Sequence, residues 1–71
     1  MQARDYNLRI SQDDVIEIPS RIDSSMRPYT VIVADASFTF LRSPSGEATH
    51  VFTRDVVDGI ADGRYVRRLA A

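Results

Sequence analysis

The sequence contains no cysteine and no lysine, and its only histidine is His50. Without thiols the chain cannot form a disulfide, an iron–sulfur cluster or a cysteine zinc site, and one imidazole is too few for a histidine metal site. The missing lysine excludes a Walker-type phosphate loop and Schiff-base chemistry, because both need an amine. The sequence therefore predicts no cofactor and no metal, and an enzyme is the class of function that we expect least.

The chain of 71 residues has room for one small domain only, spanning 1–71. A chain of this length buries about 60% of the surface that its unfolded form exposes, so its core is close to the minimum for independent folding. We therefore expect a bound partner or self-association, a homodimer included. The first seven residues carry no apolar stretch, and the longest apolar run is 31–34. This pattern predicts neither a signal peptide nor a membrane span, and hence a cytoplasmic protein.

The charged residues show two biases in composition. Arginine replaces lysine completely, and aspartate outnumbers glutamate eight to two. GC-rich coding sequence produces both biases without selection at any one site, which suggests a bacterial or phage source. The formal net charge of -1 argues against a nucleic-acid coat and against a DNA mimic, because either needs a strong field of one sign.

The apolar residues favour strands over helices. Valine and isoleucine total thirteen, against three leucines, and β-branched residues suit a pleated sheet. Tyr6, Leu8 and Ile10 alternate with polar residues, which predicts a strand, and 15–18 reads as a return strand ended by Pro19. These two strands form a predicted N-terminal hairpin. The segment 20–28 that follows is predicted to be a loop or a single helical turn.

The middle of the chain predicts a three-stranded meander. Its strand-like runs are 29–34, 37–42 and 47–52. The segment 43–46, Ser-Pro-Ser-Gly, has the residue preferences of a type I turn closing a four-residue hairpin loop.

The two turns of the meander predict which face of the sheet is buried. The loop 43–46 places Arg42 opposite Glu47, and a tight turn at 35–36 places Val33 opposite Phe38. Both registers give the same core face, because alternate residues of a strand point the same way. Its predicted members are Val31, Val33, Phe38, Phe40 and Val51, with Tyr29 beside Arg42 at the rim. The opposite face is too apolar for an open sheet, so we expect it to be covered within the fold or to serve as a dimer or partner surface.

A short helix is predicted after the meander. Thr53 suits the N-cap, Gly63 suits the C-terminal cap, and Gly59 is a weak point. Four residues on one face are expected to pack on the sheet, namely Val56, Val57, Ile60 and Ala61. Alternation resumes at 64–69 and predicts a last strand. The predicted fold is therefore α+β: a small antiparallel sheet, built from the N-terminal hairpin and the meander, with one short helix near the C-terminus and a last strand. A partly closed barrel or a sandwich is one form of this arrangement.

Two charged clusters near the C-terminus are the candidate interaction residues. The aspartates at 55, 58 and 62 share one helix face, which fits a solvated surface, a protein contact or, least of all, a cation site. The basic segment 64–68 fits a charged edge strand, a protein contact or a nucleic-acid contact, because arginine beside tyrosine suits both phosphate and base stacking. The predicted interaction residues are Arg54, Asp55, Asp58, Asp62, Arg64, Tyr65, Arg67 and Arg68. No serine or carboxylate is spaced to make His50 a catalytic base.

One resemblance runs through the first half of the chain. The Ile-Pro-Ser-Arg-Ile of 18–22, followed by Tyr-Thr-Val-Ile-Val at 29–33 and Phe-Thr-Phe-Leu-Arg at 38–42, resembles the Ile-Pro turn and following hairpin of swapped-hairpin antitoxins. The chain lacks the Gly-Arg pair that those domains carry before Ile-Pro. What the resemblance implies is a DNA-binding function.

Together these features predict a non-enzymatic domain that acts by binding another protein. The setting that we expect is a phage or mobile-element protein that blocks or adapts a host machine sterically, as anti-CRISPR proteins do, in the cytoplasm of a bacterial or phage-infected cell. The first alternative is a small nucleic-acid-binding module, of antitoxin or small-barrel type, that uses the C-terminal arginines. The second alternative is a structural subunit of an assembly.

Overall fold

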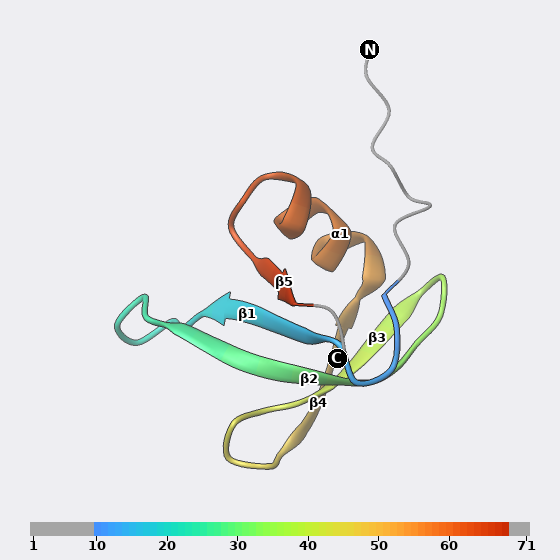
Figure 1. Ribbon diagram of the computed structural model, residues 1–71, viewed down its shortest axis with the longest axis horizontal. Helices are drawn as coiled ribbons and strands as arrows, with labels where there is room; N and C mark the ends of the chain where they lie inside the picture. Colours follow the sequence, from blue (N-terminus) through green and yellow to red (C-terminus); the bar gives the residue numbers. More distant parts are fainter. Residues whose placement is uncertain (1–9, 69–71) are drawn as a thin grey trace.

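The computed structural model describes residues 10–68, which form one antiparallel sheet with a single short helix against it (Figure 1). Along the sheet the strand order is β4-β3-β2-β1-β5. The prediction of an α+β fold with one helix before a last strand is confirmed. The sheet is not a closed barrel, and β4 and β5 are its two edges. The elements are β1 (Val15–Pro19), β2 (Met26–Ala34), β3 (Phe38–Arg42), β4 (Ala48–Phe52), α1 (Thr53–Ala61) and β5 (Val66–Arg68).

β1 is an inner strand of the sheet. Both of its edges are paired, one with β2 and the other with β5. β1 therefore forms its hairpin with β2, through the loop 20–25, and the strand predicted at 6–10 lies almost wholly outside the described residues. β2 begins at Met26, three residues before the predicted start at Tyr29.

The longer β2 is compatible with Pro28 because of where the missing N–H would point. The Val31 N–H donates to the Asp14 carbonyl at 2.8 Å, and the Val31 carbonyl accepts from the Asp13 N–H at 2.8 Å. Since these groups alternate along a strand, the nitrogen of Pro28 faces away from β1. On the other side of β2, β3 ends opposite Thr30. No neighbouring strand therefore needs a backbone N–H from residue 28.

The predicted register of the β3–β4 hairpin is wrong by one residue. The turn itself forms as expected, since the Gly46 N–H donates to the Ser43 carbonyl at 2.9 Å. However, the Ser43 N–H donates to the Glu47 carbonyl at 2.8 Å, so Glu47 belongs to the loop, and Arg42 pairs with Ala48. A one-residue shift moves every side chain of a strand to the other face.

The predicted register of the β2–β3 hairpin is also wrong. The Asp35 carboxylate accepts hydrogen bonds from the N–H groups of Ser37 (2.8 Å) and Phe38 (2.7 Å), within the turn that connects β2 to β3. These two donors lower the pKa of Asp35 below its usual value. Val33 pairs with Phe40 instead of Phe38, a shift of two residues that leaves both side chains on one face. The irregularity between Val31 and Val33 then turns these two side chains to opposite faces.

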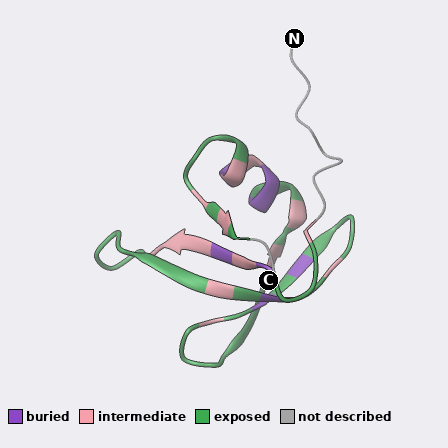
Figure 2. Ribbon diagram, in the orientation of Figure 1, coloured by how far each residue is buried: buried purple, intermediate pink, exposed green. Residues whose placement is uncertain are grey.

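The core lies between α1 and the face of the sheet that it covers, which we call the inner face (Figure 2). Its fully buried hydrophobic residues are Ile16, Val31, Leu41 and Val56. Three members of the predicted core are instead exposed on the opposite, outer face, namely Val33, Phe38 and Phe40. The predicted core set mixed the two faces: the irregularity in β2 separates Val31 from Val33, and the one-residue shift of the β3–β4 hairpin separates Val51 from Phe38.

Helix α1 begins at Thr53, one residue before the start that an N-cap at Thr53 predicts, so Thr53 does not cap it. Phe52 is the N-cap residue and has no side-chain capping bond. The Thr53 hydroxyl instead donates to the Asp35 carbonyl at 2.8 Å and lies 2.8 Å from the Thr39 hydroxyl. At the other end Gly63 has φ +80° and its N–H donates to the Ile60 carbonyl, as expected for a C-terminal glycine.

Gly59 is a close-packing position, not merely a weak point of the helix. A Cβ added there would lie 2.4 Å from Cδ2 of Tyr65, and Gly59 is buried. Alanine stabilises an ordinary helix interior by about 1 kcal/mol relative to glycine. In this chain we expect Gly59→Ala to lower the free energy of unfolding by about 1–3 kcal/mol, because the ring of Tyr65 must move. Urea denaturation followed by circular dichroism measures this difference.

The control is the same substitution in a Tyr65→Ala background. Without the ring the helix propensity of alanine should dominate, and Gly59→Ala should then stabilise the variant. A stabilising effect of Gly59→Ala in the wild-type chain would contradict the packing of Tyr65 on the helix.

Candidate functional site

The predicted acidic residues of α1 lie in two places. Asp55 and Asp58 line a shallow hollow beside Phe38 and Phe52, together with Arg54. Asp62 is the C-cap residue of the helix. Its carboxylate lies 3.5 Å from the Arg64 guanidinium. Among residues 10–68 no three histidine or acidic side chains gather as the ligands of a metal ion.

The predicted arginine segment does not form one surface. Arg67 lies on the inner face of β5, where its Nε and Nη2 donate to Oδ2 of Asp14 at 3.1 and 2.7 Å. The side chains of Arg67 and Asp14 are 13% and 3% exposed, so this pair belongs to the core. Arg68 lies on the outer face, 3.4 Å from the carboxylate of Glu17. Strand alternation separates these two neighbours.

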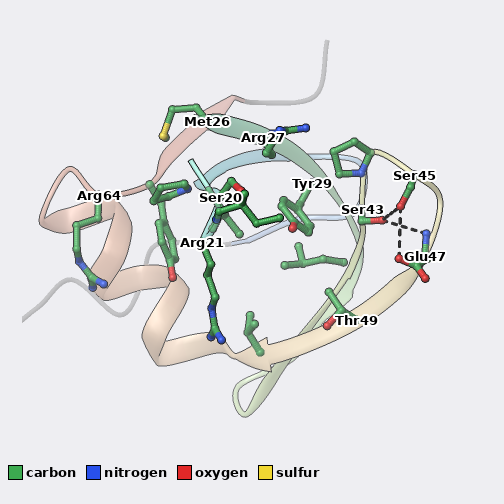
Figure 3. Close-up of a pocket in the computed structure, with 17 residues that line it drawn as sticks. Ser20, Arg21, Met26, Arg27, Tyr29, Ser43, Ser45, Glu47, Thr49 and Arg64 are labelled. Carbon is green, nitrogen blue, oxygen red and sulfur yellow. Dashed lines mark hydrogen bonds between the residues drawn. The ribbon is translucent and has the colours of Figure 1, made fainter. Parts of the chain in front are cut away.

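Arg64 and Tyr65 lie at one end of a groove on the inner face. The Arg64 guanidinium is 5.4 Å from the centre of the Tyr65 ring, within the range of a cation–π contact. The groove has a volume of about 980 Å³ and is bounded by the loop 20–25 on one side and the loop 43–47 on the other (Figure 3). Its apolar floor consists of Ile18, Tyr29, Leu41, Val51 and Tyr65.

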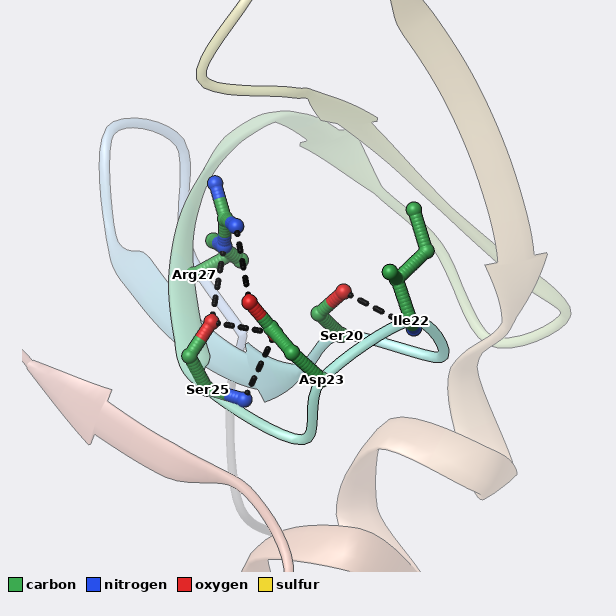
Figure 4. Close-up of polar contacts among 5 residues, drawn as sticks. All are labelled: Ser20, Ile22, Asp23, Ser25 and Arg27. Carbon is green, nitrogen blue, oxygen red and sulfur yellow. Dashed lines mark hydrogen bonds and ion pairs between the residues drawn. The ribbon is translucent and has the colours of Figure 1, made fainter.

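The loop 20–25 is held in shape by its own polar side chains (Figure 4). The Asp23 carboxylate accepts from the N–H and the hydroxyl of Ser25, at 3.0 and 2.7 Å, and lies 3.6 Å from the Arg27 guanidinium. The hydrogen bonds from Ser25 lower the pKa of Asp23 below its usual value. At the turn next to Asp23, Ile22 has 95% of its surface exposed and lines the groove. An ordered loop therefore presents an isoleucine to solvent.

Three arginines and one glutamate give the groove its charge. Arg27 and Arg64 already have carboxylate partners within the chain. Arg21 extends into the groove and forms no hydrogen bond or ion pair among residues 10–68 (Figure 3). Glu47 lies at the far rim, where its carboxylate accepts from the Ser45 hydroxyl at 3.4 Å. The groove therefore offers one unpaired cation above an apolar floor.

The outer face carries an exposed line of rings that we call the aromatic strip. Phe40 lies 5.6 Å from His50 between ring centres, His50 lies 5.7 Å from Phe38, and Phe38 stacks on Phe52 at 5.2 Å. The sequence placed Phe38 and Phe40 in the core and so did not predict this strip. The sequence did indicate part of the strip, because alternation along β4 places His50 and Phe52 on the same face.

Comparison with protein-family models, with curated proteins and with solved structures finds no match for this chain. In the part of the chain that the structure describes, α1 is nine residues long. No helix in that part has the length and apolarity needed to cross a membrane.

Proposed function

We propose that the protein is a non-enzymatic binding module whose groove holds an extended segment of a protein partner. The observation that supports this most directly is the groove itself, with an apolar floor and the exposed Ile22 at its rim. An apolar side chain left in water at an ordered loop gains free energy when a partner buries it. A role without catalysis is further supported by His50, whose ring contacts are with Phe38 and Phe40.

The charge of the groove favours a protein segment over nucleic acid. A single strand needs several unpaired cations along its phosphates. Here Arg27 and Arg64 are already partly neutralised by Asp23 and Asp62, and Glu47 adds a negative charge at the rim. A protein segment with one or two carboxylates beside apolar side chains matches this surface better than a nucleic-acid strand with a phosphate at every nucleotide. The expected partner segment therefore alternates apolar and acidic residues.

A module of this kind acts sterically, by occupying a surface that another protein would use. Its small size, and the lack of an assembled catalytic group among the residues that the structure describes, agree with a phage or mobile-element protein that blocks or adapts a host machine in the cytoplasm. The nucleic-acid-binding module and the assembly subunit are the competing functions, and the tests below separate them.

The groove is tested with a fluorescein-labelled eight-residue peptide of alternating leucine and glutamate, measured by fluorescence anisotropy. We expect saturable binding to the full chain, weakened at least about tenfold by Arg21→Glu because the unpaired cation becomes an anion, a change of about 1.4 kcal/mol or more. Ile22→Ser should also weaken binding and leave the folded state unchanged, since Ile22 has few contacts to lose.

The control variant is Arg54→Glu, which changes an equal charge at an exposed residue outside the groove. It should bind the peptide as the wild type does. A labelled eight-nucleotide oligothymidine is the second probe. Binding of the oligothymidine that falls steeply from 50 to 200 mM salt, without binding of the peptide, would replace the proposal with the nucleic-acid module.

A further inference from the structure

The free edge of β4 lacks the features that usually protect an edge strand. Edge strands avoid pairing with other chains by means of charges, prolines, bulges or very short length. β4 consists of Ala-Thr-His-Val-Phe, and its five residues pair regularly with β3 without a register shift. Four of these residues, all except Val51, are exposed. Within residues 10–68 no strand pairs with this edge, so it is open to a further strand.

The hydrogen-bonding groups that face this open edge can be identified. The Ser43 N–H donates to the Glu47 carbonyl, and the Thr53 N–H donates to the Ser37 carbonyl. Residues 47 and 53 thus face β3, and by alternation Thr49 and Val51 face it too. The N–H and carbonyl groups of Ala48 and His50, and the N–H of Phe52, point away from β3 to the open edge.

We infer that a second copy of this chain pairs with β4 in antiparallel fashion, with His50 opposite His50 of the partner subunit. Two-fold dimers, in which the same surface of both subunits forms the interface, are the commonest homo-oligomers. Centring it on His50 uses all five residues of β4 and both outward groups of His50. The N–H of Phe52 then donates to the carbonyl of the partner's Ala48, and the reverse.

The side chains of β4 complement one another in this register. On the outer face the ring of Phe52 lies beside the partner's Ala48, whose methyl group leaves space for the ring. On the inner face Thr49 lies beside the partner's Val51, a pairing of two β-branched residues that suits neighbouring strands. β4 carries no charged side chain, so no like charges oppose each other across the two-fold axis.

The pairing also explains why the aromatic strip is exposed. The strip reaches β4 through His50 and Phe52. Two copies joined at β4 bring their strips together at the two-fold axis and shield the edges of these rings. β4 shares Thr49 and Val51 with the groove, but Arg21 and Ile22, the residues that test the groove, are not part of β4, so the two proposals can fail separately.

The register is tested by cross-linking, because a chain without cysteine allows one thiol to be placed at a time. In the proposed dimer the two Cα atoms of residue 50 are about 5.5 Å apart, within the range of a disulfide. Those of residue 48 are about 14 Å apart. Under mild oxidation at equal concentration, His50→Cys should form a disulfide-linked dimer at least ten times faster than Ala48→Cys. Equal rates, or no cross-link at residue 50, would overturn the register.

The edge itself is tested by sedimentation of the full chain at several concentrations. His50→Pro removes an N–H that has no partner among residues 10–68 and places a ring carbon at the open edge, whereas His50→Ala keeps the N–H. We expect dimers for the wild type and for His50→Ala, and an association constant at least ten times lower for His50→Pro, with circular dichroism confirming that both variants fold. A monomeric wild type, or equal association of the two variants, overturns the proposal. In either case the peptide titration of the groove remains informative.

Discussion

Replacing Leu41 with alanine is expected to lower the free energy of unfolding by about 2–5 kcal/mol, the usual range for a buried leucine. Leu41 is fully buried and belongs to the cluster with Ile16, Val31 and Val56. Small domains have a total stability of about 5 kcal/mol or little more. The variant should therefore be unfolded in a substantial fraction of molecules, as measured by urea denaturation followed by circular dichroism.

The matched control is the neighbouring residue, Phe40→Ala. Phe40 is 40% exposed on the outer face and contacts only the ring of His50 among the aromatic residues described. Its loss should lower the free energy of unfolding by about 1 kcal/mol or less, since exposed positions contribute little. If Phe40→Ala were the more damaging variant, β3 would bury the face of Phe40, as the sequence pattern suggested, and not the face of Leu41.

This pair of variants also marks how far the sequence could predict the fold. The strands, the helix at 53–61 and its glycine end are local features, and local patterns predicted them. The faces of the strands depend on the number of residues in each turn. Glu47 joins the loop of the β3–β4 hairpin, and an irregularity between Val31 and Val33 shifts β2 by one residue against β3. Neither feature changes the residue preferences of the turns, so these one-residue shifts were undetectable from the pattern.

A buried polar residue, Thr39, also led the prediction to bury the wrong face of β3. Thr39 is fully buried because its hydroxyl bonds to the Thr53 hydroxyl, which donates to the Asp35 carbonyl. Hydrophobicity alone assigns the phenylalanines on either side of Thr39 to the core. The network that satisfies Thr39 joins residues 18 positions apart, and a sequence gives no sign of such a contact.

The candidate site was predictable only in part. Helix spacing correctly grouped Asp55 with Asp58, and both line one hollow. The groove was not predicted, because its walls come from two loops that β2 and β3 separate in the sequence. The clearest missed signal is Ile22. It is an isoleucine in a polar loop, and none of its neighbours in that loop is apolar. The arginines at 67 and 68 were treated as one cluster although a strand sends them to opposite faces.

The second large effect is expected at Asp14. Asp14→Ala should lower the free energy of unfolding by about 3–5 kcal/mol, because it leaves the Arg67 guanidinium largely buried without its carboxylate. It also removes the acceptor of the Ser11 N–H, which lies 3.0 Å from Oδ2. The control is Glu17→Ala, which breaks the other pairing between β1 and β5, the exposed pair with Arg68. That variant should change stability by less than about 1 kcal/mol.

A double variant separates the effect of an unpaired buried charge from the effect of lost side-chain volume. Asp14→Leu with Arg67→Met leaves no unpaired charge in the core, so it should recover most of the stability lost by Asp14→Ala, as buried ion pairs replaced by apolar residues often do. Recovery should be incomplete because the Ser11 N–H still lacks its acceptor. The comparison is made by urea denaturation of all four chains. If Asp14→Ala were no more damaging than Glu17→Ala, Arg67 would not depend on Asp14, and β5 would again be a candidate for the arginine surface that the sequence predicted.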